Sequence, residues 1–258
     1  LGGLTTAAIR AFIRKYDVDM SEALESDAAR YASFNAFFTR ALKPGARPLA
    51  AAGLLCPVDG AISQLGPIAA GRLIQAKGQD YALAELLGGD AALAQRFADG
   101  EFATLYLSPR DYHRIHMPCA AVLREMIHVP GSLYPVNGRS VAAVPGLFAR
   151  NERLVCVFDA SGDDAAFGRF VLVLVGATIV GSIATTWAGV VTPPRRRQVQ
   201  RTTYDDATAP RFARGDEMGC FELGSTVITV FEPGRMRFAA DWHSGRAIRM
   251  GERLGALS

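Results

Sequence analysis

The stretch Leu223-Gly224-Ser225-Thr226-Val227-Ile228-Thr229-Val230-Phe231 joins a turn-like tetrapeptide to a run of β-branched and aromatic residues, which is typical of a β-strand. Similar short apolar runs recur along most of the chain, with turn residues between them: Ala61–Leu65, Arg72–Ala76, Phe102–Leu107, Val122–Val129, Leu154–Phe158, Arg169–Val175, Thr178–Thr185, Thr226–Phe231 and Met236–Ala240. We therefore predict an α+β protein whose larger part is a mostly antiparallel β domain of barrel-sandwich-like form.

The first 48 residues follow a helical pattern instead. Apolar residues recur there at helical spacing, at Ile9, Phe12, Ile13 and Tyr16. Asp19 and Ser21 are predicted to cap the next helix. An aromatic cluster follows, next to basic residues: Phe34, Phe37, Phe38, Arg40, Lys43 and Arg47. Such a segment either lies in a membrane interface or packs on the core as an ordinary helix, and the residues alone leave both open.

We place the domain boundary in the connector Pro48–Gly60, so that residues 1–48 form the helical segment and residues 49–258 the main domain. Within the main domain, Tyr81–Phe97 is predicted to be helical, with a break at Gly88-Gly89 and Asp90 as a cap. The polar, basic stretch Thr192–Gly215 is predicted to be a loop.

One stretch, Phe170–Pro194, has no charged residue and is long enough to span a bilayer. It is rich in Val, Ile and Thr and is interrupted by Gly176, Gly181 and Gly189, which favours two buried strands over a membrane span.

Composition excludes several classes of protein. The chain has 258 residues, half of them hydrophobic, so it can bury a large core without metal or disulfide bonds. A net charge of +3 does not indicate a nucleic-acid-binding protein. Its four cysteines form no Cys-x-x-Cys pair, so we expect free, mostly buried thiols in a reducing compartment and no metal site. No secretory signal is visible, but the chain begins at Leu1 without methionine, and we expect earlier residues to be missing.

The Gly224-Ser225 bond suggests a specific chemistry. In a tight turn the serine hydroxyl can add to the preceding carbonyl and convert the amide into an ester, and glycine leaves the carbonyl unobstructed. β-Elimination then cuts the chain and leaves a dehydroalanine, which hydrolyses to a pyruvoyl group. The serine needs a base, and the motif that holds His113 and His116 could supply one, with Asp59 as its orienting carboxylate. Each of these residues also has an ordinary structural interpretation, as a turn residue or a hydrogen-bonded histidine.

Further motifs favour the catalytic interpretation of these residues over the structural one. They are Ser33-Phe34-Asn35-Ala36-Phe37-Phe38-Thr39-Arg40, Pro57-Val58-Asp59-Gly60, Leu107-Ser108-Pro109-Arg110-Asp111-Tyr112-His113-Arg114-Ile115-His116-Met117-Pro118, Asn151-Glu152-Arg153 and Val175-Gly176-Ala177-Thr178-Ile179-Val180-Gly181-Ser182-Ile183. With Leu223-Gly224-Ser225-Thr226, in this order, the chain resembles the phosphatidylserine decarboxylase proenzymes of the membrane-associated bacterial type, from about Tyr16 to Pro233.

This resemblance implies that Asp59, His116 and Ser225 form the triad for self-cleavage between residues 224 and 225. The two products would be a β chain, 1–224, and an α chain, 225–258, which stay together as a heterodimer. Two such heterodimers could in turn form a dimer. Ser225 becomes the pyruvoyl cofactor, which forms a Schiff base with phosphatidylserine, releases CO₂ and gives phosphatidylethanolamine, while His113 protonates the carbanion. The resemblance also implies a peripheral protein on the cytoplasmic side of the cell membrane.

The remaining candidate residues receive structural interpretations. His128, in an apolar strand, is predicted to be structural, and His243 to lie at the surface or in packing. Tyr112 is predicted to be a core residue rather than a catalytic one. Arg110 and Arg114 could contact the lipid phosphate or form salt bridges within their loop, and both interpretations stay open.

Three other functions are compatible with parts of the sequence. Asp59, His116 and Ser225 could form a serine hydrolase, although Ser225 lacks a Gly-x-Ser-x-Gly elbow. A barrel-sandwich carrier could take a phosphoryl group on its paired histidines, and a membrane-binding module could use the N-terminal helices. Only a self-processing decarboxylase predicts two chains from one gene.

Overall fold

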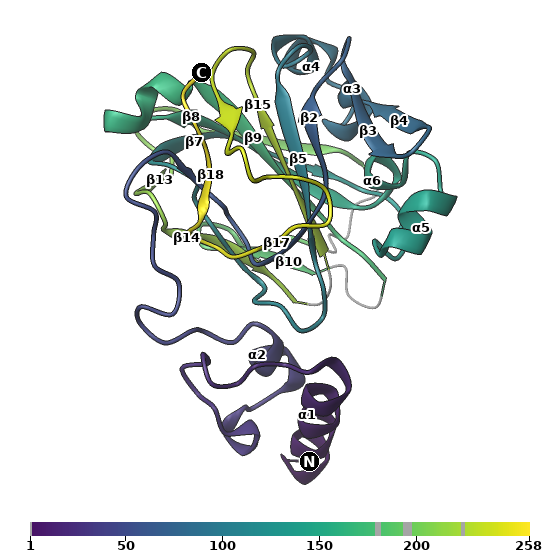
Figure 1. Ribbon diagram of the computed structural model, residues 1–258, viewed down its shortest axis with the longest axis vertical. Helices are drawn as coiled ribbons and strands as arrows, with labels where there is room; N and C mark the ends of the chain where they lie inside the picture. Colours follow the sequence, from purple (N-terminus) through teal and green to yellow (C-terminus); the bar gives the residue numbers. More distant parts are fainter. Residues whose placement is uncertain (1, 179–181, 193–197, 223–224) are drawn as a thin grey trace.

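The computed structural model describes residues 2–178, 182–192, 198–222 and 225–258. A nine-stranded sheet forms the body of the protein (Figure 1). Its strands are β2 (Gly60–Pro67), β5 (Glu101–Leu107), β7 (Ala121–Val129), β8 (Arg153–Ala160), β9 (Arg169–Val175), β12 (Gln200–Thr203), β13 (Arg211–Phe212), β15 (Ser225–Phe231) and β17 (Ala247–Ile248). The order is β12-β7-β8-β9-β15-β5-β2-β17, with β13 also paired to β7, and all these pairs are antiparallel.

Smaller sheets and short helices cover the two faces of this sheet. One four-stranded sheet has the order β11-β10-β14-β6, one three-stranded sheet the order β1-β18-β16, and β3 pairs with β4. These strands are β1 (Leu54–Leu55), β3 (Arg72–Ala76), β4 (Gln79–Ala82), β6 (Arg114–His116), β10 (Ile183–Thr185), β11 (Gly189–Val190), β14 (Glu217–Phe221), β16 (Arg237–Phe238) and β18 (Arg253–Ala256). The helices of the main domain are α3 (Leu83–Leu86), α4 (Ala91–Arg96), α5 (Gly138–Ala143), α6 (Leu147–Arg150) and the 3₁₀ turn η2 (Gly162–Phe167).

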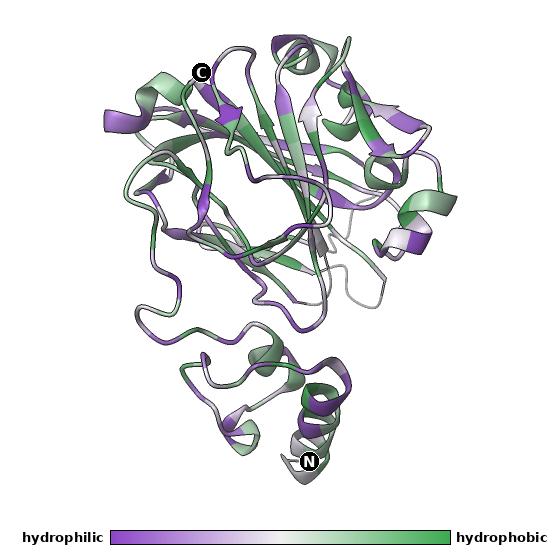
Figure 2. Ribbon diagram, viewed as in Figure 1, coloured by the Kyte–Doolittle hydropathy of each residue, from purple (hydrophilic) through white to green (hydrophobic). Residues whose placement is uncertain are grey.

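Both faces of the central strands are buried, which explains their unbroken apolar sequence. In β9, Phe170, Leu172 and Leu174 belong to one hydrophobic cluster, and the alternate residues Val171 and Val173 belong to another. The first cluster extends to β6, β10 and β14, and the second to β3, β4 and the helices α3, α5 and α6. The sheet is therefore the middle of three layers, and Figure 2 shows its central strands coloured mainly as hydrophobic.

The predicted α+β class with mostly antiparallel sheets is confirmed. Within the described part of the chain, β12 and β17 at the two ends of the sheet do not pair with each other, so the sheet stays open. The expected barrel-sandwich form is therefore not confirmed. For Phe170–Pro194, the structure places strands at β9, β10 and β11, although residues 179–181 and 193–194 lie outside the described part. Over the described ranges, no helix is both long and apolar enough to cross a membrane.

The N-terminal segment is less helical than predicted. It contains α1 (Gly2–Tyr16), the 3₁₀ turn η1 (Ala28–Arg30) and α2 (Phe34–Phe38), and lies below the sheets in Figure 1. The prediction that Asp19 and Ser21 cap a helix is wrong, because Asp19 accepts the Ser21 N–H in a local turn instead. The helix caps are Asp27 and Ser33, whose side chains accept from backbone N–H groups of η1 and α2.

The aromatic residues of this segment pack against one another. Phe37 and Phe38 are buried in a small cluster with Ile9, Val18 and Ala28, and Phe12 packs onto it. The surface of α1 carries the exposed Arg10, Arg14 and Lys15 instead. The phenylalanines therefore stabilise the fold of the segment, and its polar and basic face remains toward solvent.

Three other local predictions need correction. Tyr81 lies in β4, so the helical patch reduces to α3 and α4, but Asp90 does cap α4 by accepting the Leu93 N–H at 2.8 Å. The expected loop Thr192–Gly215 contains β12 and β13, which pair with β7 because that strand has a free edge there. The run Met236–Ala240 shortens to β16, whereas the run Thr178–Thr185 contains β10 and its residues 179–181 lie outside the described part.

Candidate active site

The candidate site lies where three neighbouring strands of the central sheet begin or end. Ser225 is the first residue of β15 and pairs with Leu107, the last residue of β5. On the other side of β5, β2 begins at Gly60, directly after Asp59. Sheet order therefore brings Asp59 and Ser225 to the same edge, one strand apart. Gly224, the side chain of Ser225 and thus the predicted cleavage geometry lie outside the described part.

Gly60 fixes where Asp59 lies. Its φ is +149°, and a Cβ at this position would lie 2.2 Å from the carbonyl oxygen of Tyr106. Only glycine combines this backbone conformation with such a close approach to the neighbouring strand. The short distance between β2 and β5 therefore depends on Gly60, and so does the position of the preceding carboxylate.

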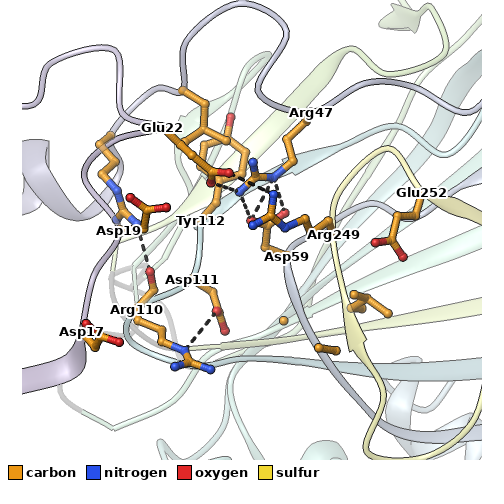
Figure 3. Close-up of a pocket in the computed structure, with 15 residues that line it drawn as sticks. Asp17, Asp19, Glu22, Arg47, Asp59, Arg110, Asp111, Tyr112, Arg249 and Glu252 are labelled. Carbon is orange, nitrogen blue, oxygen red and sulfur yellow. Dashed lines mark hydrogen bonds and ion pairs between the residues drawn. The ribbon is translucent and has the colours of Figure 1, made fainter.

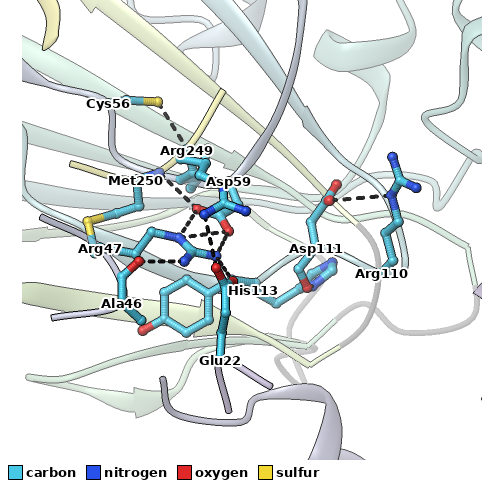
Figure 4. A network of polar contacts seen from close by, with 12 residues as sticks. Glu22, Ala46, Arg47, Cys56, Asp59, Arg110, Asp111, His113, Arg249 and Met250 are labelled. Atoms are coloured by element: carbon cyan, nitrogen blue, oxygen red, sulfur yellow. Dashed lines mark hydrogen bonds and ion pairs between the residues drawn. The ribbon is translucent and has the colours of Figure 1, made fainter. Parts of the chain in front are cut away.

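Asp59 is 7% exposed and is held by a buried arginine. Arg47 Nε lies 2.9 Å from Oδ1, Arg47 Nη2 bonds to Oδ2, and the Met250 N–H donates to Oδ1 at 2.8 Å (Figure 4). Arg47 also donates to Glu22, which binds Arg249 at 2.9 Å. Burial lowers the pKa of Arg47, but the hydrogen bonds that Arg47 donates to Asp59 and Glu22, together with their negative charges, outweigh this and raise the pKa above its ordinary value. A chain of alternating charges thus links the N-terminal segment to Asp59.

His116, the last residue of β6, has both ring nitrogens occupied. Its Nδ1 lies 2.9 Å from the carbonyl oxygen of Gly215 and therefore carries a proton. Its Nε2 lies 3.0 Å from the hydroxyl of Tyr112, which donates to the neutral ring. Burial lowers the pKa of His116, and the effects that raise it, from the hydrogen bond to Gly215 and the charges of Glu217 and, to a smaller extent, Asp59, offset this only in part. The result is a neutral imidazole whose lone pair is on Nε2, as a base requires.

The expected contact between Asp59 and His116 is not among the hydrogen bonds of the described residues. The Gly215 carbonyl fixes the tautomer of His116, and Asp59 is close enough to act through its charge. Tyr112 is buried as predicted, but its hydroxyl is part of the site, which the sequence did not indicate. Its spacing of four residues from His116 carries no recognisable signal.

His113 is completely buried just before β6. Its Nδ1 lies 2.8 Å from the carbonyl of Asp111, and its ring packs on Phe38 with 4.1 Å between centroids. The Nε2 has no hydrogen-bond partner in the described part of the chain. Burial lowers the pKa of His113 to about 3, so the ring is neutral at pH 7. The His113 carbonyl accepts from Phe221, at the end of β14, the strand that leads toward Ser225.

A polar pocket of about 410 Å³ opens beside Asp59, between the N-terminal segment and the sheet edge (Figure 3). It is lined by Asp17, Asp19, Glu22, Arg40, Leu42, Arg47, Asp59, Gly60, Arg110, Asp111, Tyr112, Ala247, Ile248, Arg249 and Glu252. The residues before His113 thus form one wall and residues 17–47 the opposite one. The pocket can accept a small, charged group next to the candidate catalytic residues.

The other candidate residues take structural positions. His128 is buried and lies 3.0 Å from Glu152, whereas His243 is exposed, as their sequence contexts predicted. Arg114 forms an ion pair with Glu217 at 2.8 Å. The four cysteines are free, and three of them are buried. In the described ranges no group of three or more His, Cys, Asp or Glu side chains could hold a metal ion.

Comparison with known proteins identifies the family. The family profile for phosphatidylserine decarboxylase matches residues 34–256. A "Phosphatidylserine decarboxylase proenzyme" of Methylibium petroleiphilum is 61% identical to the chain, covering 98% of this chain and 87% of that protein. Proteins of the same name from Chromobacterium violaceum and Polaromonas naphthalenivorans are 60% and 58% identical, over 99% and 100% of this chain and 89% and 88% of theirs. The chain is therefore an enzyme of the phosphatidylserine decarboxylase family.

Proposed function

We propose that this protein is a self-processing, pyruvoyl-dependent enzyme that converts phosphatidylserine into phosphatidylethanolamine and CO₂ in phospholipid biosynthesis. The observation that carries the proposal is the match over nearly the full length to proteins named as proenzymes of this decarboxylase. The position of Asp59 and the start of β15 at one end of the central sheet, with the His116 N–H bonded to the Pro57 carbonyl two residues before Asp59, supports it.

In the first step the chain cuts itself between Gly224 and Ser225. The Ser225 hydroxyl oxygen adds to the Gly224 carbonyl carbon, and the amide becomes an ester. β-Elimination breaks the bond between the Ser225 Cβ and the ester oxygen and leaves Gly224 with a free carboxylate. The dehydroalanine that remains takes up water, loses ammonia and becomes the pyruvoyl group at the start of the α chain, 225–258. The β chain, 1–224, stays bound to it, and these heterodimers can associate further.

His116 and Asp59 have defined roles in this step. The Nε2 lone pair of His116 accepts the proton of the Ser225 hydroxyl once Tyr112 releases it. The Gly215 carbonyl keeps the proton on Nδ1, and the negative charge of Asp59 stabilises the imidazolium that forms. Arg47 holds Asp59 in place for this purpose.

The residues present fit a pyruvoyl group at Ser225, because a buried acceptor without a partner, His113 Nε2, lies near the strand that leads to it. When present, the ketone supplies a sink for the electrons of the breaking bond to the carboxylate. The neutral His113 Nε2 accepts a proton from the substrate ammonium group and returns it to the substrate Cα after CO₂ has left. The negative charge of the substrate must raise the pKa of His113 for it to hold this proton.

We further propose that the protein is peripheral, on the cytoplasmic side of the membrane, with residues 1–48 at the lipid interface. Leu4 and Leu24 are 78% and 62% exposed, and Arg10, Arg14 and Lys15 are exposed on α1. An amphipathic surface with basic residues suits anionic lipid.

Intact-mass analysis of the purified protein tests the self-cleavage directly. Wild-type protein should give two masses, for residues 1–224 and 225–258, and the smaller one should be labelled by an amine with borohydride. The Ser225→Ala protein should remain one chain and stay unlabelled. A single unlabelled wild-type chain that shows no release of CO₂ from phosphatidylserine vesicles would refute the proposal.

A further inference from the structure

Arg40 is a buried arginine that forms no ion pair with a carboxylate in the described part of the chain. It follows α2 and is only 4% exposed, with its guanidinium 5.6 Å from the ring centroid of Phe37. Its Nη2 donates to the carbonyl of Arg110 at 2.9 Å, but Nε and Nη1 have no hydrogen-bond partner among the described residues. Burial lowers its pKa. A buried guanidinium with free donors is costly, which indicates that it binds a group the protein itself does not supply.

The position of Arg40 indicates where this group lies. Arg40 lines the pocket beside Asp59, and the loop that accepts its Nη2 hydrogen bond leads from Arg110 to His113. The neighbouring α2 residue Phe38 packs on the ring of His113. Two buried groups without partners, the Arg40 donors and His113 Nε2, are thus held by the same short helix and loop. A group that reached Arg40 from this pocket would therefore lie beside Asp59 and the loop that leads to His113.

The other arginines of the pocket are already engaged or exposed. Arg47 is bound to Asp59 and Glu22, and Arg249 is bound to Glu22. Arg110, which the sequence suggested as a phosphate ligand, has a side chain that is 61% exposed and lies 4.0 Å from Asp111. Charge-assisted hydrogen bonds are strongest where water is excluded, so Arg40 is the better ligand for an anion.

We propose that Arg40 binds the phosphodiester of the substrate headgroup, an inference that rests on the proposed function. The headgroup offers two anions, a carboxylate and a phosphodiester. An arginine on the carboxylate would stabilise the ground state more than the transition state, because the carboxylate loses its charge as CO₂ forms. The phosphodiester keeps its charge throughout, and only two carbons separate its oxygen from the reacting amine. Arg40 therefore anchors the phosphate and positions the amine near residue 225.

Headgroup binding to the unprocessed full chain tests this without any catalysis. In the Ser225→Ala protein, glycerophosphoserine and glycerophosphoethanolamine are titrated and binding is followed by phosphorus NMR. Replacing Arg40→Gln should weaken both ligands by a similar factor, roughly tenfold or more. Arg72→Gln, which removes one exposed arginine of β3, should leave both affinities unchanged. Loss of glycerophosphoserine binding alone would show that Arg40 binds the carboxylate and would overturn the proposal, as would unchanged binding of both.

The processed enzyme supplies a second measurement. Arg40→Gln protein should still cut itself, keep its melting temperature and show a KM for phosphatidylserine raised roughly tenfold, with Arg40→Lys in between. An Arg40→Gln protein that neither folds nor cuts itself would mean a structural role and contradict the inference. Failure of the wild-type protein to cut itself would instead refute the proposed function, while the binding titration would still report on Arg40.

Discussion

Arg47 and Asp59 form a buried ion pair at the edge of the site, and each depends on the other. The side chains are only 6% and 9% exposed, so removing one partner leaves an unmatched charge in the interior. The arginine lies in the N-terminal segment and the carboxylate at the start of the main domain. We therefore expect Arg47 to act on the proposed self-cleavage through Asp59, as a positioning residue.

Arg47→Ala should lower the free energy of unfolding by about 3 kcal/mol, because Asp59 would remain buried without its counter-charge. Self-cleavage should slow in parallel, and Arg47→Lys should restore part of both. Unfolding is best measured with urea in a Ser225→Ala background, where the protein is one chain. Arg235→Ala, which breaks a pair at 3.8 Å with an exposed arginine, should cost less than about 1 kcal/mol. Equal effects of the two substitutions would contradict the role of the buried pair.

The pH dependence of self-cleavage should report on His116. The reaction needs its unprotonated Nε2, and burial lowers the pKa of His116 below 6.5. The rate should therefore be level from about pH 8 to about pH 6.5 and fall only at lower pH, as the base becomes protonated.

Tyr112→Phe removes a hydroxyl that donates to the neutral form of His116, so the pKa of His116 should rise. The midpoint of the fall in self-cleavage rate should then move to higher pH by roughly half a unit or more. The loss of uncut chain on gels, after refolding at each pH, gives the midpoint. Tyr16→Phe in α1 should leave it unchanged. If the rate of self-cleavage depends on pH in the same way in Tyr112→Phe and in the wild type, Tyr112 does not affect the base.

At the scale of elements, the strands that the sequence revealed are those buried on both faces. β8, β9 and β15 contribute to both hydrophobic clusters, so apolar residues occupy both faces of these strands rather than alternate positions only. β12 and β13 are polar and largely exposed, and they exist because β7 offers them an edge, which no local pattern can indicate.

The same limit applies to the site. The proposed catalytic residues lie in compact motifs, whereas Arg40 and Arg47 gain their roles from contacts 70 and 12 residues away in sequence. That two N–H donors of Arg40 have no acceptor among the described residues can be recognised only when the surroundings of Arg40 are known. Sequence reasoning could therefore name the proposed catalytic histidines and Asp59 but could not connect them to the N-terminal segment.

The junction of β2 and β5 provides a test at this scale. Gly60→Ala would place a methyl group 2.2 Å from the Tyr106 carbonyl oxygen at φ +149°, so β2 must shift and Asp59 with it. We expect a loss of stability of about 2–3 kcal/mol and slower self-cleavage. Gly66→Ala is a matched control in the same strand, with φ +141° and no atom within 4 Å of the new carbon. If both substitutions cost the same, backbone strain rather than the close approach of the strands is responsible.

At the scale of the whole molecule, the N-terminal segment has two separate surfaces. One side contributes Glu22, Arg40 and Arg47 to the pocket wall, and α1 exposes basic residues elsewhere. The segment is therefore part of the active site as well as a candidate lipid-binding surface. If residues 1–48 bind lipid as we propose, membrane contact and the pocket would lie at the same end of the protein, because this segment lies below the sheets in Figure 1 and contributes to the pocket lining.

This arrangement predicts that mutations in α1 can weaken membrane binding without changing the decarboxylation reaction itself. Replacing Arg10, Arg14 and Lys15 with Gln should weaken binding to anionic vesicles by about 3 kcal/mol, since each basic residue near the surface contributes about 1 kcal/mol. Vesicle sedimentation measures the binding, and the difference should shrink as salt is added. Decarboxylation of a short-chain, water-soluble phosphatidylserine should be unchanged, because these residues are not part of the pocket lining.

The control is a protein with the same loss of charge elsewhere: Arg72, Arg237 and Arg253, all exposed on β3, β16 and β18, replaced with Gln. If electrostatic attraction is general, both proteins should lose vesicle binding equally, and α1 would have no special role. If α1 is the contact surface, only the first protein should detach, and its activity should fall on vesicles but not on the soluble substrate. Equal activity of both proteins on vesicles would show that the lipid reaches the pocket without help from α1.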